Sequence, residues 1–202
     1  MGSRKLVMEL KDGIKTFYAQ SQLEWRNWLD KNHESEKSIW LIIYKKESGT
    51  PSVYYTDAVD EAICFGWIDS KPNKRNNESY YQFFAKRNPK SNWSKVNKGK
   101  VAKLLENGLI APAGLKAIEI AKQNGTWTAL DQVEGMTIPD DLQKAFDKNK
   151  AAFDYFDKFP RSSKRNILEW IMNAKRPETR QARIDETIKL AYKNIKANHY
   201  RQ

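Results

Sequence analysis

The sequence predicts an α+β fold: a small, mostly antiparallel sheet with flanking helices, followed by a C-terminal helical module. Residues 39–44 (IWLIIY) are β-branched and aromatic, which is typical of a buried strand. Residues 67–70 and 80–85 lie on either side of Asn76-Asn77 and indicate a hairpin. From Pro139 onward, apolar residues recur only at helical spacing.

Four helices are expected in the first part of the chain, each beginning at a residue that favours a helix start. The expected starts are Ser21, Thr56, Ser94 and Pro112, and glycines 66, 108 and 125 are expected to end the last three helices. Ser21 and Glu24 have the spacing of a capping box. The fourth helix is expected to bury Leu115, Ile118 and Ala121.

The C-terminal part is expected to hold short helices at residues 142–146 and 153–159, a third capped by Ser162-Ser163, and a last one from Pro177. The last helix carries an apolar stripe of Ile184, Ile188, Ala191 and Ile195. We therefore predict two domains, an α+β domain at residues 1–130 and a helical domain at residues 131–202.

Composition excludes several classes of protein. The chain has no apolar run of membrane-spanning length and no apolar stretch behind a basic start, so a cytoplasmic location is expected. The single Cys64 cannot form an intramolecular disulfide, and we expect it to be a small buried apolar residue. With only His33 and His199 beside it, the sequence predicts no metal site, and it predicts no cofactor.

The net charge of +11 is concentrated in two stretches. Residues 71–103 hold ten Lys or Arg and one Glu, a net charge of +9. Residues 161–183 hold seven Lys or Arg and two Glu, a net charge of +5, which leaves −3 for the rest of the chain. If these stretches share one face, they form a surface that attracts anions.

Asp69 follows the apolar run ICFGWI and precedes the first basic stretch. A carboxylate held by rigid neighbours can serve as a general base, but no second acid or histidine lies near it in sequence. The alternative is that Asp69 pairs with Arg75 or Arg87, or with a backbone amide, and organises a cationic site. We favour the alternative.

Two further segments could bind an anion. Residues 86–97 place Arg87, Ser91, Trp93 and Asn97 around a predicted helix start, where free amides favour phosphate; alternatively, Trp93 packs in the core and Ser94 only caps the helix.

Residues 174–183 gather four cations at a helix junction, Lys175, Arg176, Arg180 and Arg183. Alternatively, Glu169, Glu178 and Asp185 neutralise these cations locally.

Four motifs carry a resemblance to a known family: YTDAVDEAICFGWID at 55–69, AKRNPKSNWSKVN at 85–97, PAGL at 112–115 and AKRPETR at 174–180. With these motifs the sequence resembles the YdeI/OmpD-associated family, also called bacteriocin-protection or stress-resistance proteins, from about Phe17 to Tyr192. The resemblance implies an α+β first part and a helical C-terminal module, and it implies no reaction or cofactor. Ser70 departs from the glycine common at that position.

We therefore expect a non-enzymatic protein, associated with stress or antimicrobial resistance, whose basic surface binds an anionic ligand, nucleic acid or an acidic protein. The rival hypothesis is an enzyme or small-ligand binder with a cleft around Asp69, Arg87, Ser91, Trp93 and Asn97. A third is a scaffold that binds one protein partner through exposed aromatic residues such as Tyr80 and Trp127.

Overall fold

The computed structural model describes residues 9–198, and contacts within the chain divide it into two compact units, Met1–Thr128 and Ala129–Gln202. Each unit has its own buried core. That the units are separately folding domains, with a boundary at 130/131, stays a prediction.

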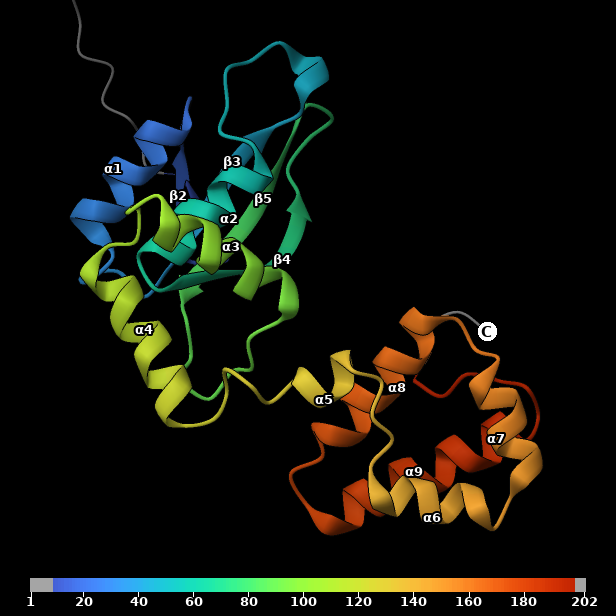
Figure 1. The fold of residues 1–202 in the computed structure, drawn as a ribbon. Coiled ribbons are helices and arrows are strands. Elements are labelled where there is room, and N and C mark those ends of the chain that lie inside the picture. The colour runs from blue at the N-terminus through green and yellow to red at the C-terminus, as the bar shows by residue number, and fades with distance from the viewer. Residues whose placement is uncertain (1–8, 199–202) are drawn as a thin grey trace, which may run out of the picture. The chain divides into compact units, whose positions relative to one another are not determined.

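The first unit contains a five-stranded sheet in the order β1-β2-β3-β5-β4 (Figure 1). The strands are β1 (Leu10–Lys11), β2 (Ile14–Tyr18), β3 (Ser38–Tyr44), β4 (Trp67–Lys74) and β5 (Ser79–Lys86). Only β2 and β3 pair in parallel, so the predicted mostly antiparallel sheet is confirmed. Strands β1 and β2 were not predicted, because both are short and polar residues interrupt their apolar ones.

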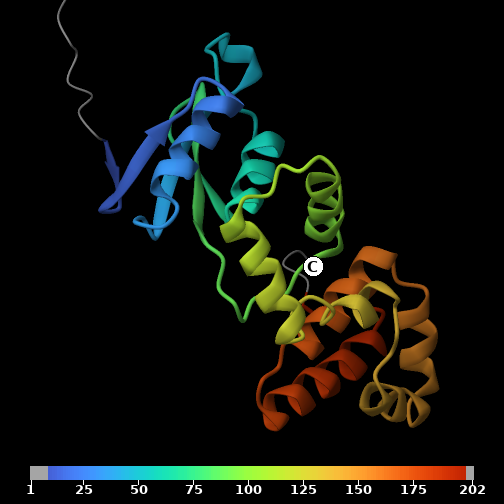
Figure 2. The same ribbon diagram turned by 60° about the vertical axis from the view of Figure 1, so that its left-hand side comes forward.

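Helices α1 (Gln22–Asn32), α2 (Tyr55–Cys64), α3 (Lys95–Glu106) and α4 (Pro112–Gln123) complete this unit, with a short 3-10 turn at Lys46–Ser48. Figure 2 shows the sheet and these helices from a second side. Alternate residues of β3, Ile39, Leu41 and Ile43, join Trp25 of α1 in the main core. On the opposite face, Trp40 packs with Tyr81 and Phe83.

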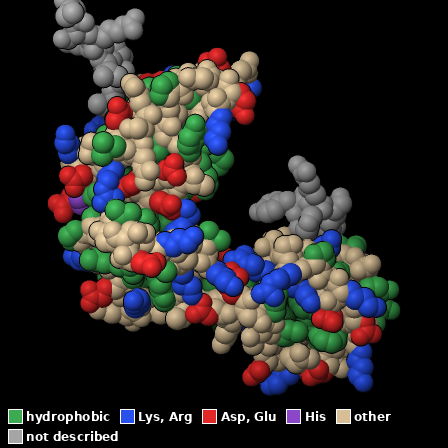
Figure 3. Space-filling view, turned by 45° about the horizontal axis from the view of Figure 1, so that its top comes forward, with side chains coloured by type: hydrophobic (Ala, Val, Ile, Leu, Met, Phe, Trp, Pro, Cys, Tyr) green, Lys and Arg blue, Asp and Glu red, His purple; other side chains and the backbone are tan. Residues whose placement is uncertain are grey.

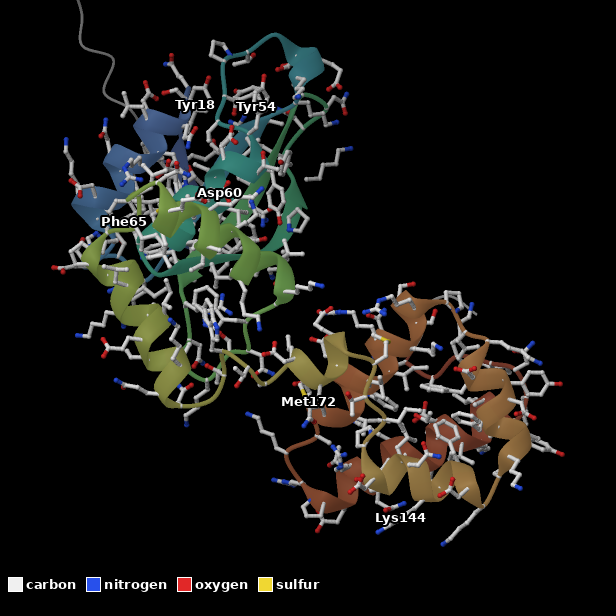
Figure 4. All side chains as sticks on the ribbon, in the orientation of Figure 1. Tyr18, Tyr54, Asp60, Phe65, Lys144 and Met172 are labelled. Atoms are coloured by element: carbon white, nitrogen blue, oxygen red, sulfur yellow. The ribbon has the colours of Figure 1, made fainter. Side chains whose placement is uncertain are left out.

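Three of the four predicted helix starts are confirmed, including that of α4 at Pro112. The Ser21 hydroxyl accepts a hydrogen bond from the Glu24 amide, and the Ser94 hydroxyl accepts one from the Asn97 amide. Thr56 was the wrong cap, because α2 already begins at Tyr55 and the Thr56 hydroxyl donates to Asp57 instead. Asp60 of α2, labelled in Figure 4, forms an ion pair with Lys100 of α3.

The end of α2 and the start of α4 meet at two glycines. Gly66 follows α2 with φ of +71°, a left-handed conformation that glycine adopts without strain. A Cβ on Gly114 would lie 2.3 Å from the Cys64 carbonyl oxygen, so only glycine permits this approach. Gly114, Ile118 and Ala121 are therefore the buried face of α4, whereas Leu115, expected in the core, is exposed.

Cys64 is fully buried, as expected, and its burial raises the pKa of the thiol to about 11.

The second unit is entirely helical: α5 (Asp131–Glu134), α6 (Asp140–Asp147), α7 (Lys150–Asp157), α8 (Arg161–Met172) and α9 (Pro177–Ala191). The prediction missed α5 and placed the start of α8 too late. Pro160 ends the extended segment and α8 begins at Arg161, so Ser162 and Ser163 lie inside the helix. Ile195 of the predicted stripe lies beyond the end of α9.

Gly114→Ala is expected to destabilise the protein by about 1–3 kcal/mol, because the added methyl meets backbone that cannot move independently. Gly99→Ala in α3 is the matched control. Nothing lies within 4 Å of its Cβ position, so alanine should raise stability by about 0.5–1 kcal/mol through helix propensity. Urea unfolding monitored by tryptophan fluorescence measures the free energy of unfolding of both variants. If Gly114→Ala and Gly99→Ala change it by the same amount, the proposed close approach is contradicted.

Candidate anion-binding site

The predicted site residues of the first basic stretch lie in three places. Asp69 is in β4, and Arg75 follows that strand directly. Arg87, Ser91 and Trp93 lie between β5 and α3, and Asn97 lies in the first turn of α3. The space-filling view in Figure 3 draws the Lys and Arg side chains of one face in blue.

Asp69 interacts with a tyrosine. The Tyr55 hydroxyl donates to its Oδ2 at 2.7 Å. Burial and this hydrogen bond raise the pKa of Tyr55 to about 12. The pairing between β4 and β5 shifts by one residue between Asp69 and Pro72, a bulge that turns the side chains of β4 at this point.

The expected pairing of Asp69 with Arg75 is wrong. Arg75 forms an ion pair with Glu9, with Nη2 and Oε2 2.9 Å apart, and it also donates to Ser79. The hydrogen bond to Glu9 raises the pKa of Arg75 and lowers the pKa of Glu9. Glu9 lies 66 residues before Arg75 in the chain, and nothing in the local pattern around Asp69 indicates it.

Arg87 is the unusual residue of this region. Its Nη2 donates to the Asn92 carbonyl at 2.6 Å, and its guanidinium carbon lies 3.8 Å from the centre of the Trp93 ring, a cation–π contact. Its Nε and Nη1 atoms are buried and have no hydrogen-bond acceptor in the described part of the protein. Burial lowers the pKa of Arg87 to about 10, an effect that the nearby Asp69 carboxylate opposes. The side chain is therefore a half-buried cation at neutral pH, with two buried nitrogens.

The loop that carries Arg87 is held by local hydrogen bonds. The Arg87 amide donates to the Gly66 carbonyl at 3.0 Å. The Asn88 side chain accepts from the Lys90 amide, and the Ser91 hydroxyl donates to the Asn88 carbonyl. Ser91 thus stabilises the turn. Asn97 contributes its backbone amide to the helix cap, donating to the Ser94 hydroxyl.

A cavity of about 150 Å³ lies beside Arg87. Trp93 and Pro89 form part of its wall, and the rest comes from one face of α4. The α4 residues that line it are Ala113, Lys116, Ala117, Ile120 and Ala121. The α4 side of the cavity was not predicted, because α4 starts 25 residues after Arg87 and carries no residue pattern that indicates a ligand.

A larger hollow of about 810 Å³ lies along β2 and α1. Two of its cations have partners, since Arg75 pairs with Glu9 and Lys15 pairs with Glu36, and a third, Lys31, is exposed to solvent. Trp40 Nε1 is also buried without an acceptor in the described residues, but it is uncharged. We therefore regard the smaller cavity as the better candidate site, because it is lined by a cation whose buried Nε and Nη1 have no acceptor within residues 9–198.

The second basic stretch is partly neutralised. Arg180 forms a two-point ion pair with Asp141, with oxygen–nitrogen distances of 2.5 and 2.9 Å. Arg183 donates to the Trp170 carbonyl and covers the Trp170 ring. The alternative of local neutralisation named Glu169, Glu178 and Asp185, whereas the partner of Arg180 is Asp141 of α6. Lys175 and Arg176 are exposed.

No group of His, Cys, Asp and Glu residues within 9–198 could hold a metal ion, and His199 lies outside the described residues. Within the same range, no helix combines the length and the apolar character needed to cross a membrane.

Comparison with known families assigns both units. The model described as "Domain of unknown function (DUF8412)" matches residues 17–117, which is half of the chain. The model described as "Bacteriocin-protection, YdeI or OmpD-Associated" matches residues 135–194. The chain is a DUF8412-family protein with a YdeI/OmpD-associated module. The resemblance seen in the sequence is thus confirmed for the second unit, while the first unit matches the separate DUF8412 family.

No curated protein and no solved structure matches the chain. The YdeI/OmpD-associated match fits a protein associated with stress or resistance.

Asp141→Asn is expected to lower the free energy of unfolding by about 0.2–1 kcal/mol at pH 7, the usual range for a partly exposed ion pair. The hydrogen bond from Arg180 lowers the pKa of Asp141 from 3.8. The stabilisation is therefore present above pH 3.8 and is lost as the pH falls through the lowered pKa. Asp140→Asn in the same helix turn is the control. If both variants lose the same stability at pH 7, the ion pair contributes nothing.

Proposed function

We propose that the DUF8412 unit binds a small anion at Arg87, and that the protein is a non-enzymatic, stress- or resistance-associated binding protein. The observation that supports this is the half-buried guanidinium, whose buried Nε and Nη1 have no acceptor among residues 9–198. Burying an isolated charge is costly, and native proteins pair such charges or place them at functional sites. A bound anion would supply the missing acceptors.

The surroundings support binding in preference to catalysis. Among residues 9–198, Asp69 is the acid that acts on Arg87, and its Oδ2 already accepts from Tyr55. The neighbouring cavity is lined mainly by apolar side chains, and its described lining has no Ser, Thr, Cys, His, Asp or Glu beside Arg87. The proposed site keeps Arg87 and Trp93 of the sequence prediction, gives Asp69 an electrostatic role, and assigns Ser91 a structural one. We place this function in the cytoplasm.

Arg87→Met is expected to weaken anion binding roughly 10- to 100-fold, because hydrogen bonds to a charged group contribute about 1.5–3 kcal/mol. The measurement is an NMR titration of the tryptophan indole signals with acetate, butyrate, phosphate and sulfate at constant ionic strength. Lys90→Met is the matched control: it removes one positive charge from the same loop, from a residue that does not line the cavity. Wild-type affinity in Arg87→Met, or no response to any of the anions, would refute the proposal.

A second candidate function is binding of an extended polyanion, nucleic acid or an acidic protein. It is favoured by five lysines of the first basic stretch that are exposed and whose side chains form no hydrogen bond or ion pair among residues 9–198, unlike Lys86, which donates to the Glu34 carbonyl: Lys71, Lys74, Lys90, Lys95 and Lys103.

Nucleic-acid binding through these lysines should weaken steeply with salt, with log K falling by about 0.9 for each phosphate contacted, so five contacts predict a slope near −4.5. Gel-shift titrations of a short DNA duplex at two salt concentrations measure this slope. A simultaneous change of Lys71, Lys74 and Lys95 to Gln should remove about three phosphate contacts and lower the magnitude of the slope to about 1.8. Absence of a shift at low salt would exclude duplex DNA as the partner.

A further inference from the structure

The size of the Arg87 cavity restricts what can bind there. Its volume of about 150 Å³ is below the roughly 300–1,000 Å³ of sites for drug-sized ligands. At about 30 Å³ for each water molecule in the liquid, it has room for the equivalent of about five waters. The ligand, or the part of it that enters, therefore consists of only a few non-hydrogen atoms.

The lining of the cavity separates two kinds of anion. Apart from Arg87, Asn88 and the exposed Lys116, it is formed by apolar or aromatic groups: Pro89, Trp93, Ala113, Ala117, Ile120 and Ala121. A phosphate has oxygens on all sides, so some would face this apolar wall and lose their hydrogen bonds to water without replacement. A carboxylate carries both oxygens at one end, and the remainder of the molecule can be apolar.

The charges around Arg87 also restrict the kind of anion that can bind. Arg87 is the cation of the lining with buried nitrogens, whereas the charge of Lys116, the second cation of the lining, is exposed and screened by solvent. The Asp69 carboxylate lies close enough to act on Arg87 electrostatically and would repel a second negative charge on the ligand. Asp69 is held in this position by the Tyr55 hydroxyl. The site is thus better matched to a monoanion than to a dianion.

We propose that the ligand of the Arg87 site is a small monocarboxylate whose apolar substituent, of a few carbon atoms, packs against Trp93 and α4. The carboxylate would accept hydrogen bonds from the guanidinium. This inference rests on the proposed anion-binding function. Free carboxylic acids and the C-terminal end of a peptide both present this chemistry.

The test compares probes on the full-length protein by NMR titration. Acetate and butyrate differ by two methylene groups, so butyrate should bind roughly tenfold more tightly if its chain is buried. Butyramide, the uncharged analogue, and inorganic phosphate at pH 8 should each bind at least about tenfold more weakly than butyrate. N-acetylalanine tests the peptide end: binding as tight as that of butyrate would identify the chain terminus as a source, and much weaker binding would identify the free acid.

Asp69→Asn tests whether the Asp69 carboxylate disfavours ligands with two negative charges. Removing the repulsion should strengthen phosphate binding several-fold while changing butyrate binding less. Arg87→Lys keeps the charge and should retain weak butyrate binding, which guards against a general loss of folding in Arg87→Met.

The outcomes separate the two proposals. If phosphate binds as tightly as butyrate, or acetate as tightly as butyrate, and Arg87→Met abolishes binding, the anion site stands and the carboxylate inference fails. If butyrate and butyramide bind equally, or no probe binds, both proposals fail.

Discussion

The close approach of α4 to the end of α2 is the contact on which the candidate site depends. The Cys64 carbonyl reaches the backbone at Gly114 and also accepts a hydrogen bond from the Ala111 amide. Two residues further on, the Gly66 carbonyl anchors the amide of Arg87. One short segment therefore places both the apolar wall and the cation of the cavity. A side chain at Gly114 would move the wall away from the guanidinium.

The site combines a rigid frame with an unfavourable charge. Asn88 and Ser91 fix the turn, Trp93 is buried and packs against Trp127, and Asn124 donates to the Pro89 carbonyl at 2.8 Å. Within this frame, two nitrogens of Arg87 have no acceptor in the part of the chain that the structure describes. Native proteins usually satisfy every buried polar group, and exceptions concentrate where stability has been exchanged for function. The apolar core of the first unit contributes the stability that offsets the burial of these two nitrogens.

Sequence reasoning was most successful where structure is local. The caps at Ser21 and Ser94, the hairpin of β4 and β5 and the glycine end of α2 all follow from residues within one turn of each other. It failed where a distant segment decides the outcome. Arg75 and Arg180 bind Glu9 and Asp141, each more than thirty residues away, and neither partner could be inferred from the basic stretches themselves. The same holds for the face of α4 beside Arg87, which contains mostly alanines.

The strand that carries Asp69 has a further consequence for the molecule in concentrated solution. β4 lies at the margin of the sheet, where unpaired backbone groups can recruit a strand from another copy. Its outer half contains Pro72, which lacks an amide hydrogen, between the exposed Lys71 and Lys74, and the bulge interrupts its regular pleat. These features discourage edge-to-edge association between copies of this strand, so the positive charge near Asp69 also protects a sheet edge.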